Sequence, residues 1–109
     1  MINNKPRRTK FPANYVGPQI RRFRAALGWS QSKLALELQL RGLNLSREVI
    51  AQIEGQTHCV SDRDLLYFAN IFNVDLPELF FGPQASHGAI AEALAKLQAA
   101  ELQNCEIKL

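Results

Sequence analysis

The 109-residue sequence has no long apolar run and contains only two cysteines. No stretch approaches the roughly 20 apolar residues that a membrane-spanning helix needs, and the N-terminus lacks the apolar segment of a signal peptide. These absences predict a cytoplasmic protein without a membrane partner. Cys59 and Cys105 lie far apart in the sequence, and we expect both to be ordinary thiols in a reducing compartment.

The sequence also lacks the motifs of catalytic and metal sites. It has no paired-carboxylate motif, no nucleophile elbow and no glycine loop that could hold a phosphate. His58, Cys59, His87 and Cys105 do not have the spacing of a chelating motif. We therefore expect neither an enzyme, nor a metal site, nor a bound cofactor.

Acidic residues are absent from the first 24 residues, which carry seven basic groups, whereas the remaining 85 residues carry six basic and ten acidic groups. Pro6 and Pro12 interrupt any helix there, so residues 1–16 are predicted to form a basic arm. A basic arm on a mildly acidic body suits a polyphosphate partner. A solvated tail would have the same composition, so charge alone leaves both interpretations open.

Apolar residues recur at helical spacing after the arm and predict an all-α domain over residues 17–82. The apolar fraction of 47% is sufficient for one modest core. The positions expected to face this core are Ile20, Phe23, Leu27, Leu34, Leu38, Val49, Ile50, Ile53, Leu65, Leu66, Ala69, Phe72, Leu79 and Phe80.

Capping residues mark where the predicted helices begin and end. Serine hydroxyls at positions 30, 46 and 61 can accept hydrogen bonds from free backbone amides at helix starts. Gly42 and Asn73 can adopt the left-handed conformation that ends a helix. Asp75 and Glu78 have the spacing of a capping box for a short fifth helix.

Residues 83–109 are predicted to add an extra C-terminal helix and tail. Ser86 is a candidate cap, and Ile90, Leu94 and Leu97 form an apolar stripe in an alanine-rich segment. The stripe can fold back on the domain or pair with a second copy. We expect the homodimer, because symmetric half-sites multiply the affinity of short recognition elements.

Three runs together resemble the lambda-repressor-like, or XRE-type, helix-turn-helix family of DNA-binding domains. They are IRRFRAALGWSQSKLALEL, LSREVIAQIEG and FNVDLPELF, which begin at residues 20, 45 and 72. The resemblance covers about two-thirds of the chain, from Gly17 to Gly82. It implies a compact five-helix domain that binds double-stranded DNA and regulates transcription, expected to be a repressor.

The resemblance also implies which residues contact DNA. The helix over residues 47–54 would enter the major groove, and its expected base contacts are Arg47, Glu48, Ala51 and Gln52. The expected contacts with the DNA backbone within the domain are Gln31, Lys33, Ser46, Gln56, Thr57 and Arg63, although Arg63 can equally pair with Asp62 or Asp64. The basic charge of the arm, comparable to that of a homeodomain arm, adds Arg7, Arg8 and Lys10 as candidates. A further implied feature is a structural pair between Arg24 and Glu54.

The chain departs from the family pattern in one respect. The separation from Gln31 to Glu54 is longer than usual by roughly one helical turn, so either the preceding helix extends through Leu40 or the turn RGLNL is expanded. The leucines of this region are expected to pack against the helix over 47–54 or against another subunit. They are Leu36, Leu40, Leu43 and Leu45.

A protein-interaction module is the alternative function. In that interpretation, the C-terminal helix binds a partner protein, as in the antitoxin half of a toxin and antitoxin pair. DNA binding and partner binding are compatible in one chain.

Overall fold

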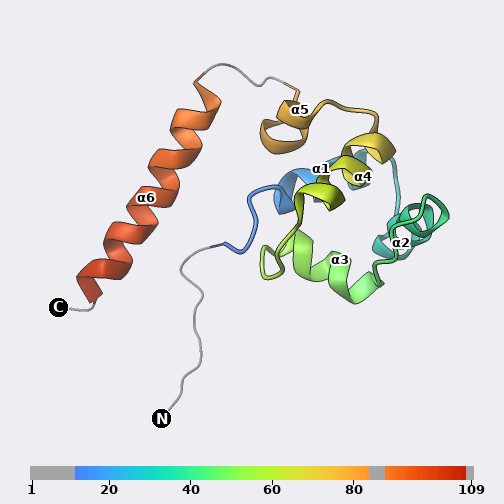
Figure 1. Cartoon of the computed structure of the whole chain (residues 1–109), viewed down its shortest axis with the longest axis horizontal. Coiled ribbons are helices and arrows are strands. Elements are labelled where there is room, and N and C mark those ends of the chain that lie inside the picture. The colour runs from blue at the N-terminus through green and yellow to red at the C-terminus, as the bar shows by residue number, and fades with distance from the viewer. Residues whose placement is uncertain (1–11, 84–87, 108–109) are drawn as a thin grey trace, which may run out of the picture. The chain divides into compact units, whose positions relative to one another are not determined.

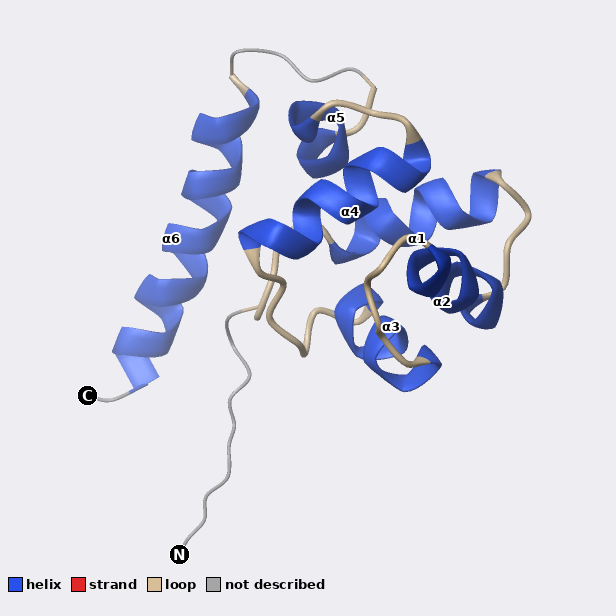
Figure 2. Ribbon diagram, turned by 45° about the vertical axis from the view of Figure 1, so that its right-hand side comes forward, coloured by secondary structure: helices blue, strands red, loops and turns tan. Residues whose placement is uncertain are grey.

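The computed structural model describes the backbone of residues 12–83 and 88–107. The regular secondary structure in these ranges is all helical (Figure 2), which confirms the predicted all-α class. The helices are α1 (Gly17–Ala26), α2 (Gln31–Leu40), α3 (Arg47–Glu54), α4 (Asp62–Phe72), α5 (Leu76–Phe81) and α6 (Ala89–Ile107). None of these described helices combines the length and the apolarity needed to cross a membrane.

The first five helices belong to one unit, and α6 is described separately. Within the unit, α1 contacts α3, α4 and α5, whereas α2 contacts α3 and α4 (Figure 1). The short helix α3 is therefore held chiefly by α1 and α2. A helix of eight residues is not stable alone in water, so this packing is what maintains α3.

The ends of the helices follow the capping chemistry of the sequence. Ser30, Ser46 and Ser61 each accept a hydrogen bond from the backbone amide three residues later, at 3.0 to 3.1 Å. Asn73 ends α4 with a φ of 57°, and Gly42 follows α2 with a φ of 105°. These local predictions are confirmed, because each depends on residues that are close in sequence.

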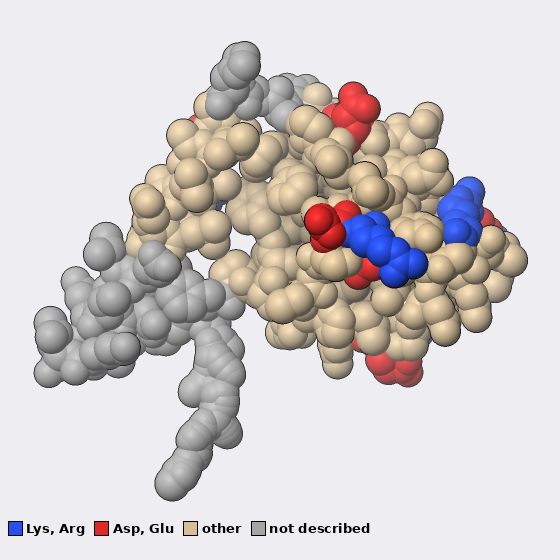
Figure 3. Space-filling view, in the orientation of Figure 1, with Lys and Arg blue, Asp and Glu red and all other residues tan. Residues whose placement is uncertain are grey.

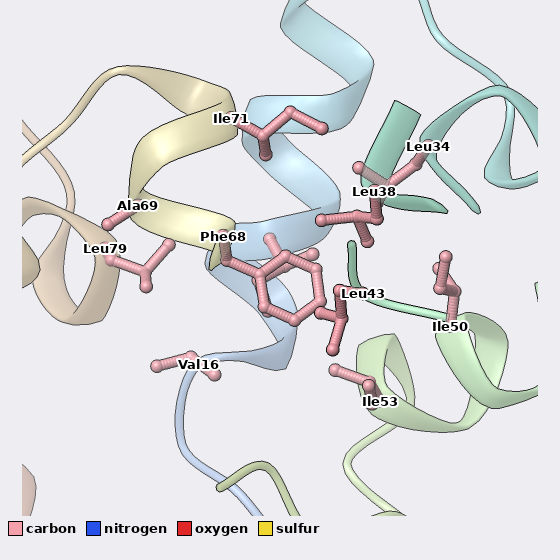
Figure 4. Packing of buried hydrophobic residues seen from close by; sticks show 11 residues of the cluster. Val16, Leu34, Leu38, Leu43, Ile50, Ile53, Phe68, Ala69, Ile71 and Leu79 are labelled. Carbon is pink, nitrogen blue, oxygen red and sulfur yellow. The ribbon is translucent and has the colours of Figure 1, made fainter. Parts of the chain in front are cut away.

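The core lies where α1 to α5 meet, and Phe68 of α4 occupies its middle (Figure 4). Phe68, Ile20, Leu34, Leu38, Ile50 and Leu79 have no exposed surface, and Ile53 is 1% exposed. The Phe72 ring stacks 5.4 Å from the Phe23 ring and 6.4 Å from the Phe68 ring, measured between centroids. The core thus fixes one face of α3 through Ile50 and Ile53.

Two residues predicted to face the core are exposed instead. Leu27 is 49% exposed and stands at the C-cap of α1, one residue beyond Ala26. Leu66 is 61% exposed, and the buried face of α4 runs through Phe68, Ala69 and Ile71. The predicted positions Leu65, Ala69 and Phe72 do lie in or against the core, so Leu66 is the incorrect position of this stripe.

The predicted boundary of the N-terminal arm is also different in the structure. Val16, assigned to the arm, is 2% exposed and belongs to the core. Asn14 forms hydrogen bonds to the segment after α3, as described below. Residues 13–16 therefore belong to the folded unit, and Arg7, Arg8 and Lys10 lie outside the described residues.

The extra length between Gln31 and Glu54 is partly helical, since α2 extends through Leu40 before a six-residue connection to α3. Leu43 in that connection is 7% exposed and joins the core, and Leu45 packs against the core. Leu36 and Leu40 are 49% and 71% exposed, so the expected packing of these two leucines against α3 is wrong.

Helix α6 contains the predicted C-terminal segment. Its Ile90 and Leu94, which are four residues apart, are 60% and 51% exposed. The proposed cap at Ser86 lies outside the described residues.

Candidate nucleic-acid interface

Helix α3 has a buried apolar face and an exposed polar face. Its hydrophobic residues Ile50 and Ile53 are in the core, whereas Arg47, Glu48 and Gln52 are exposed and Ala51 is partly buried. The exposed positions lie within two turns of one another, at the spacing that places side chains on one side of a helix. All four residues predicted to contact bases therefore lie away from the core.

The C-terminal end of α3 is attached to α1 by a buried ion pair. Arg24 donates from Nε to Glu54 Oε2 at 2.6 Å and from Nη2 to Glu54 Oε1 at 3.0 Å. The side chain of Glu54 is 4% exposed and that of Arg24 is 15% exposed. This bidentate geometry is the strongest form of an arginine–carboxylate contact. The structure thus contains the pair that the resemblance implied.

Arg24 also connects to the loop between α1 and α2. Its Nη1 donates to the backbone oxygen of Trp29 at 2.6 Å. The hydrogen bond to Glu54 raises the pKa of Arg24 above its ordinary value, and burial opposes that increase only in part. The guanidinium therefore remains charged and holds three segments of chain in one arrangement.

Gln31 extends this network to the exposed face of α3. Its Nε2 donates to Glu54 Oε1 at 3.0 Å, and its Oε1 accepts from Nη1 of Arg47 at 3.1 Å. Gln31 is predicted to contact a phosphate, and in the structure its side chain bridges the buried carboxylate and an exposed arginine. No spacing rule in the sequence indicated this bridge.

Asn14, to which no sequence motif assigns a role, holds the segment after α3 in place. Asn14 Nδ2 donates to the backbone oxygens of Ile53 and His58, at 3.0 and 2.8 Å. Its Oδ1 accepts from the backbone amide of Gly17 at 2.8 Å. One side chain therefore connects the start of α1 to both sides of the turn that follows α3.

Gln56 belongs to the same fastening. It adopts a left-handed φ of 64°, and its Nε2 donates to the backbone oxygen of Asn14 at 3.1 Å. One of the two N–H donors of this amide is thus used within the fold, and the contact of Gln56 with the DNA backbone stays a prediction. Thr57 remains exposed, and its hydroxyl donates to the backbone oxygen of Gln52 at 3.3 Å.

The other predicted backbone contacts are exposed but have partners within the fold. Lys33 Nζ lies 3.0 Å from Glu37 Oε2 and 6.0 Å from the centre of the Trp29 ring. The hydroxyl of Ser46 caps α3. The guanidinium of Arg63 lies 5.9 Å from the centre of the Tyr67 ring, and Arg63 stands between Asp62 and Asp64 in the first turn of α4. Arg63 is consequently the least favourable of these phosphate contacts.

Charge on the described unit is balanced. Residues 12–83 contain seven basic and seven acidic groups. On the face that Figure 3 shows, the lysine and arginine side chains of the described residues gather in two separate places, with carboxylates beside the central one. The folded unit by itself therefore supplies little general attraction for a polyanion, and local geometry has to provide the recognition.

We found no significant match to the chain among protein-family models, curated proteins or solved structures. Support for a function therefore comes from the arrangement of the chain's own side chains.

Proposed function

We propose that the chain is a sequence-specific, double-stranded-DNA-binding transcriptional regulator with a lambda-repressor-like helix-turn-helix domain. In this proposal α2 and α3 are the two helices of the motif, and α3 enters the major groove. Binding at a promoter would exclude the transcription machinery, so the protein acts as a repressor.

The observation that carries this proposal is the division of α3 into two faces. Ile50, Ile53 and Glu54 hold one face in the fold, and Arg47, Glu48 and Gln52 extend from the other. Arginine donors match the two acceptors of guanine, an amide matches adenine, and a carboxylate accepts from the amino group of cytosine. Ala51 allows close approach and can touch a thymine methyl group. A short helix with these groups fixed in direction is suited to contact base edges.

The arm completes the proposed interface. The backbone amide of Ala13 donates to the oxygen of Gln56 at 2.9 Å, so the chain leading from the arm joins the folded unit at the end of α3. The folded unit carries no net charge, whereas the first eleven residues contain four basic groups and no acid. We propose that Arg7, Arg8 and Lys10 supply phosphate contacts beside the helix that contacts the bases.

Two copies of the chain would bind a symmetric site as a homodimer. A single α3 presents only four candidate base contacts, and a second copy doubles the number of base pairs recognised. In this proposal the exposed Ile90 and Leu94 of α6 contribute to the contact between copies.

Selection of bound fragments from a random duplex library, followed by fluorescence anisotropy, tests the proposal. We expect a symmetric enriched site and binding that weakens steeply as salt is added. Gln52→Ala should weaken binding to the selected site by about 1 to 3 kcal/mol and relax the preference for one base pair of that site. Gln39→Ala changes an exposed glutamine of α2 and is the matched control.

Enrichment of no sequence, or equal losses from Gln52→Ala and Gln39→Ala, would refute base recognition by α3. Thermal unfolding of both variants should match the wild type. The two substitutions remove the same groups from exposed helix positions, so a difference in DNA binding can be attributed to the position of Gln52 on α3.

A protein-interaction module is the second candidate, and the exposed apolar residues of α6 favour it. Ile90 and Leu94 are more than half exposed, and neighbouring exposed apolar groups often mark a protein contact. Salt-sensitive DNA binding without sequence preference, together with a loss of partner binding in Leu94→Lys, would support this function over the first.

A further inference from the structure

Glu37 of α2 is a carboxylate held between two cations of the same helix. Its Oε2 lies 3.0 Å from Nζ of Lys33, and its Oε1 accepts a hydrogen bond from Nη1 of Arg41 at 3.0 Å. The side chain of Glu37 is 20% exposed, whereas the side chain of Lys33 is 45% exposed. Each oxygen of the carboxylate therefore faces one cation, and the cations extend farther into solvent than the carboxylate does.

The two cations are not held equally. Nη1 of Arg41 also donates to the backbone oxygen of Glu37 at 3.2 Å, so this arginine remains attached to α2 without the carboxylate. Lys33 precedes Glu37 by four residues, which is the weaker order of charges for a pair on a helix. An exposed pair of this kind changes an equilibrium constant by no more than about fivefold. Lys33 is thus the cation that another anion can take from Glu37.

Lys33 stands in the first turn of α2, at the end of the helix that contacts α3. Two residues before it, the side chain of Gln31 is bonded to both Glu54 and Arg47 of α3. The free amides of a first turn and the helix dipole attract anions, and the first turn of α2 contains no acidic residue. A duplex along the exposed face of α3 would therefore bring phosphates to the end of α2 that carries Lys33.

We infer that Glu37 is a positioning residue that competes with DNA phosphates for Lys33, an inference that rests on the proposed DNA-binding function. A contact between a lysine and a phosphate strengthens binding to every sequence by a similar factor, because phosphates carry no sequence information. Glu37 thus acts as an internal counterion, which lowers the affinity for all duplexes and leaves the choice of sequence to α3.

A general effect of net charge is the competing explanation, because removal of any carboxylate makes the protein more attractive to a polyanion. Glu92→Gln separates the two explanations. Glu92 is an exposed glutamate of α6, and its replacement changes the net charge by the same amount as Glu37→Gln. Only competition for Lys33 makes the effect of Glu37→Gln depend on the presence of that lysine.

The test measures fluorescence anisotropy on the duplex selected by the wild type and on random duplex, over a series of salt concentrations. The single variants are Glu37→Gln, Lys33→Gln and Glu92→Gln. Two double variants combine Glu37→Gln with Lys33→Gln or with Arg41→Gln. Glutamine keeps the shape of glutamate and its helix propensity, and thermal unfolding at neutral pH checks that each variant is folded.

We expect Glu37→Gln to bind both duplexes about two- to fivefold more tightly, since the pair with Lys33 is worth no more than this. The plot of log affinity against log salt should become steeper by up to about 0.9, the value for one neutralised phosphate. Lys33→Gln should remove this gain, and it should weaken binding more in the Glu37→Gln background than in the wild type. Arg41→Gln should leave the gain in place, and Glu92→Gln should bind as the wild type does.

No gain in Glu37→Gln, an equal gain in Glu92→Gln, or a gain that persists without Lys33 would each overturn the inference while leaving the proposed function intact. A gain confined to the selected duplex would also overturn it, because a phosphate contact strengthens binding to all sequences. A wild type that selects no site would refute the proposed function, and the measurements on random duplex would still decide whether Glu37 competes for Lys33.

A second substitution covers the case in which Glu37→Gln does not fold. Glu37→Ala also removes the carboxylate and introduces the residue with the highest helix propensity. It should give the same gain in affinity on both duplexes and the same dependence on Lys33. A folded Glu37→Ala protein with the affinity of the wild type would contradict competition for Lys33.

Discussion

Replacement of Arg24 by methionine is the most informative test of the fold around α3. The substitution removes the guanidinium and leaves the carboxylate of Glu54, whose side chain is 4% exposed, with the amide of Gln31. Loss of one partner from a buried ion pair typically costs 3 to 5 kcal/mol, and the partial exposure of Arg24 favours the lower end, so we expect about 3 kcal/mol.

Removal of both charges should restore much of this stability. In the double variant Arg24→Met with Glu54→Leu, no ion has to be buried, and hydrophobic replacements of buried pairs are often neutral or stabilising. We therefore expect the double variant to lie within about 1 kcal/mol of the wild type and above the single variant.

Arg41→Met provides the matched control. Arg41 Nη1 lies 3.0 Å from Glu37 Oε1 on the surface of α2, and its side chain is 41% exposed. An exposed pair of this kind contributes about 0 to 1 kcal/mol, because water and salt screen the charges. The same chemical substitution is thus expected to cause a large loss of folding stability at Arg24 and a small loss at Arg41.

Urea denaturation followed by circular dichroism measures these differences, with thermal unfolding as a second assay. A loss of about 3 kcal/mol should lower the melting temperature by roughly 12 °C or more in a domain of this size. If Arg24→Met lowers the free energy of unfolding by less than about 1 kcal/mol, or if the double variant is no more stable than the single one, the conclusion that Arg24 and Glu54 form a desolvated ion pair is refuted. Arg24 has a raised pKa, so its contribution is lost only in strong alkali and the difference should persist near neutral pH.

Three smaller changes test the acid response, a close helix contact and an exposed leucine. Hydrogen bonds from Lys33 and then Arg41 lower the pKa of Glu37 below its ordinary value of 4.5. The ionised Glu37 therefore contributes its full stabilisation of the fold above pH 4.5, and this stabilisation is lost as the pH falls through the lower pKa of the folded protein. Glu37→Gln should remove this part of the acid sensitivity in thermal unfolding; an identical pH profile would contradict the assignment. Gly17→Ala should cost at least about 2 kcal/mol by denaturation, since the added Cβ would collide with the backbone oxygen of Ile53; a neutral effect would show that α1 and α3 lie farther apart. Leu40→Lys should stay within about 0.5 kcal/mol of the wild type, and a larger loss would reveal an apolar contact of this 71% exposed residue.

The sequence by itself determined the helical class and most helix ends. Ser46, Ser61 and Asn73 could be assigned because a cap joins groups three residues apart or depends on one residue's own φ. The faces of short helices were also predictable where apolar spacing was unambiguous, as for Ile50 and Ile53. The Arg24 and Glu54 pair came from the family resemblance, since no local rule connects residues thirty positions apart.

Only the tertiary structure decided which groups meet between the helices. The exposure of Leu36 and Leu66 depends on where neighbouring helices lie, and helical periodicity does not contain that information. The bridge through Gln31 and the fastening by Asn14 join residues far apart in sequence, at distances set by how α1, α2 and α3 cross. Local chemistry specifies the helices and their ends, but long-range hydrogen bonds form only once the packed core has fixed the helices in place.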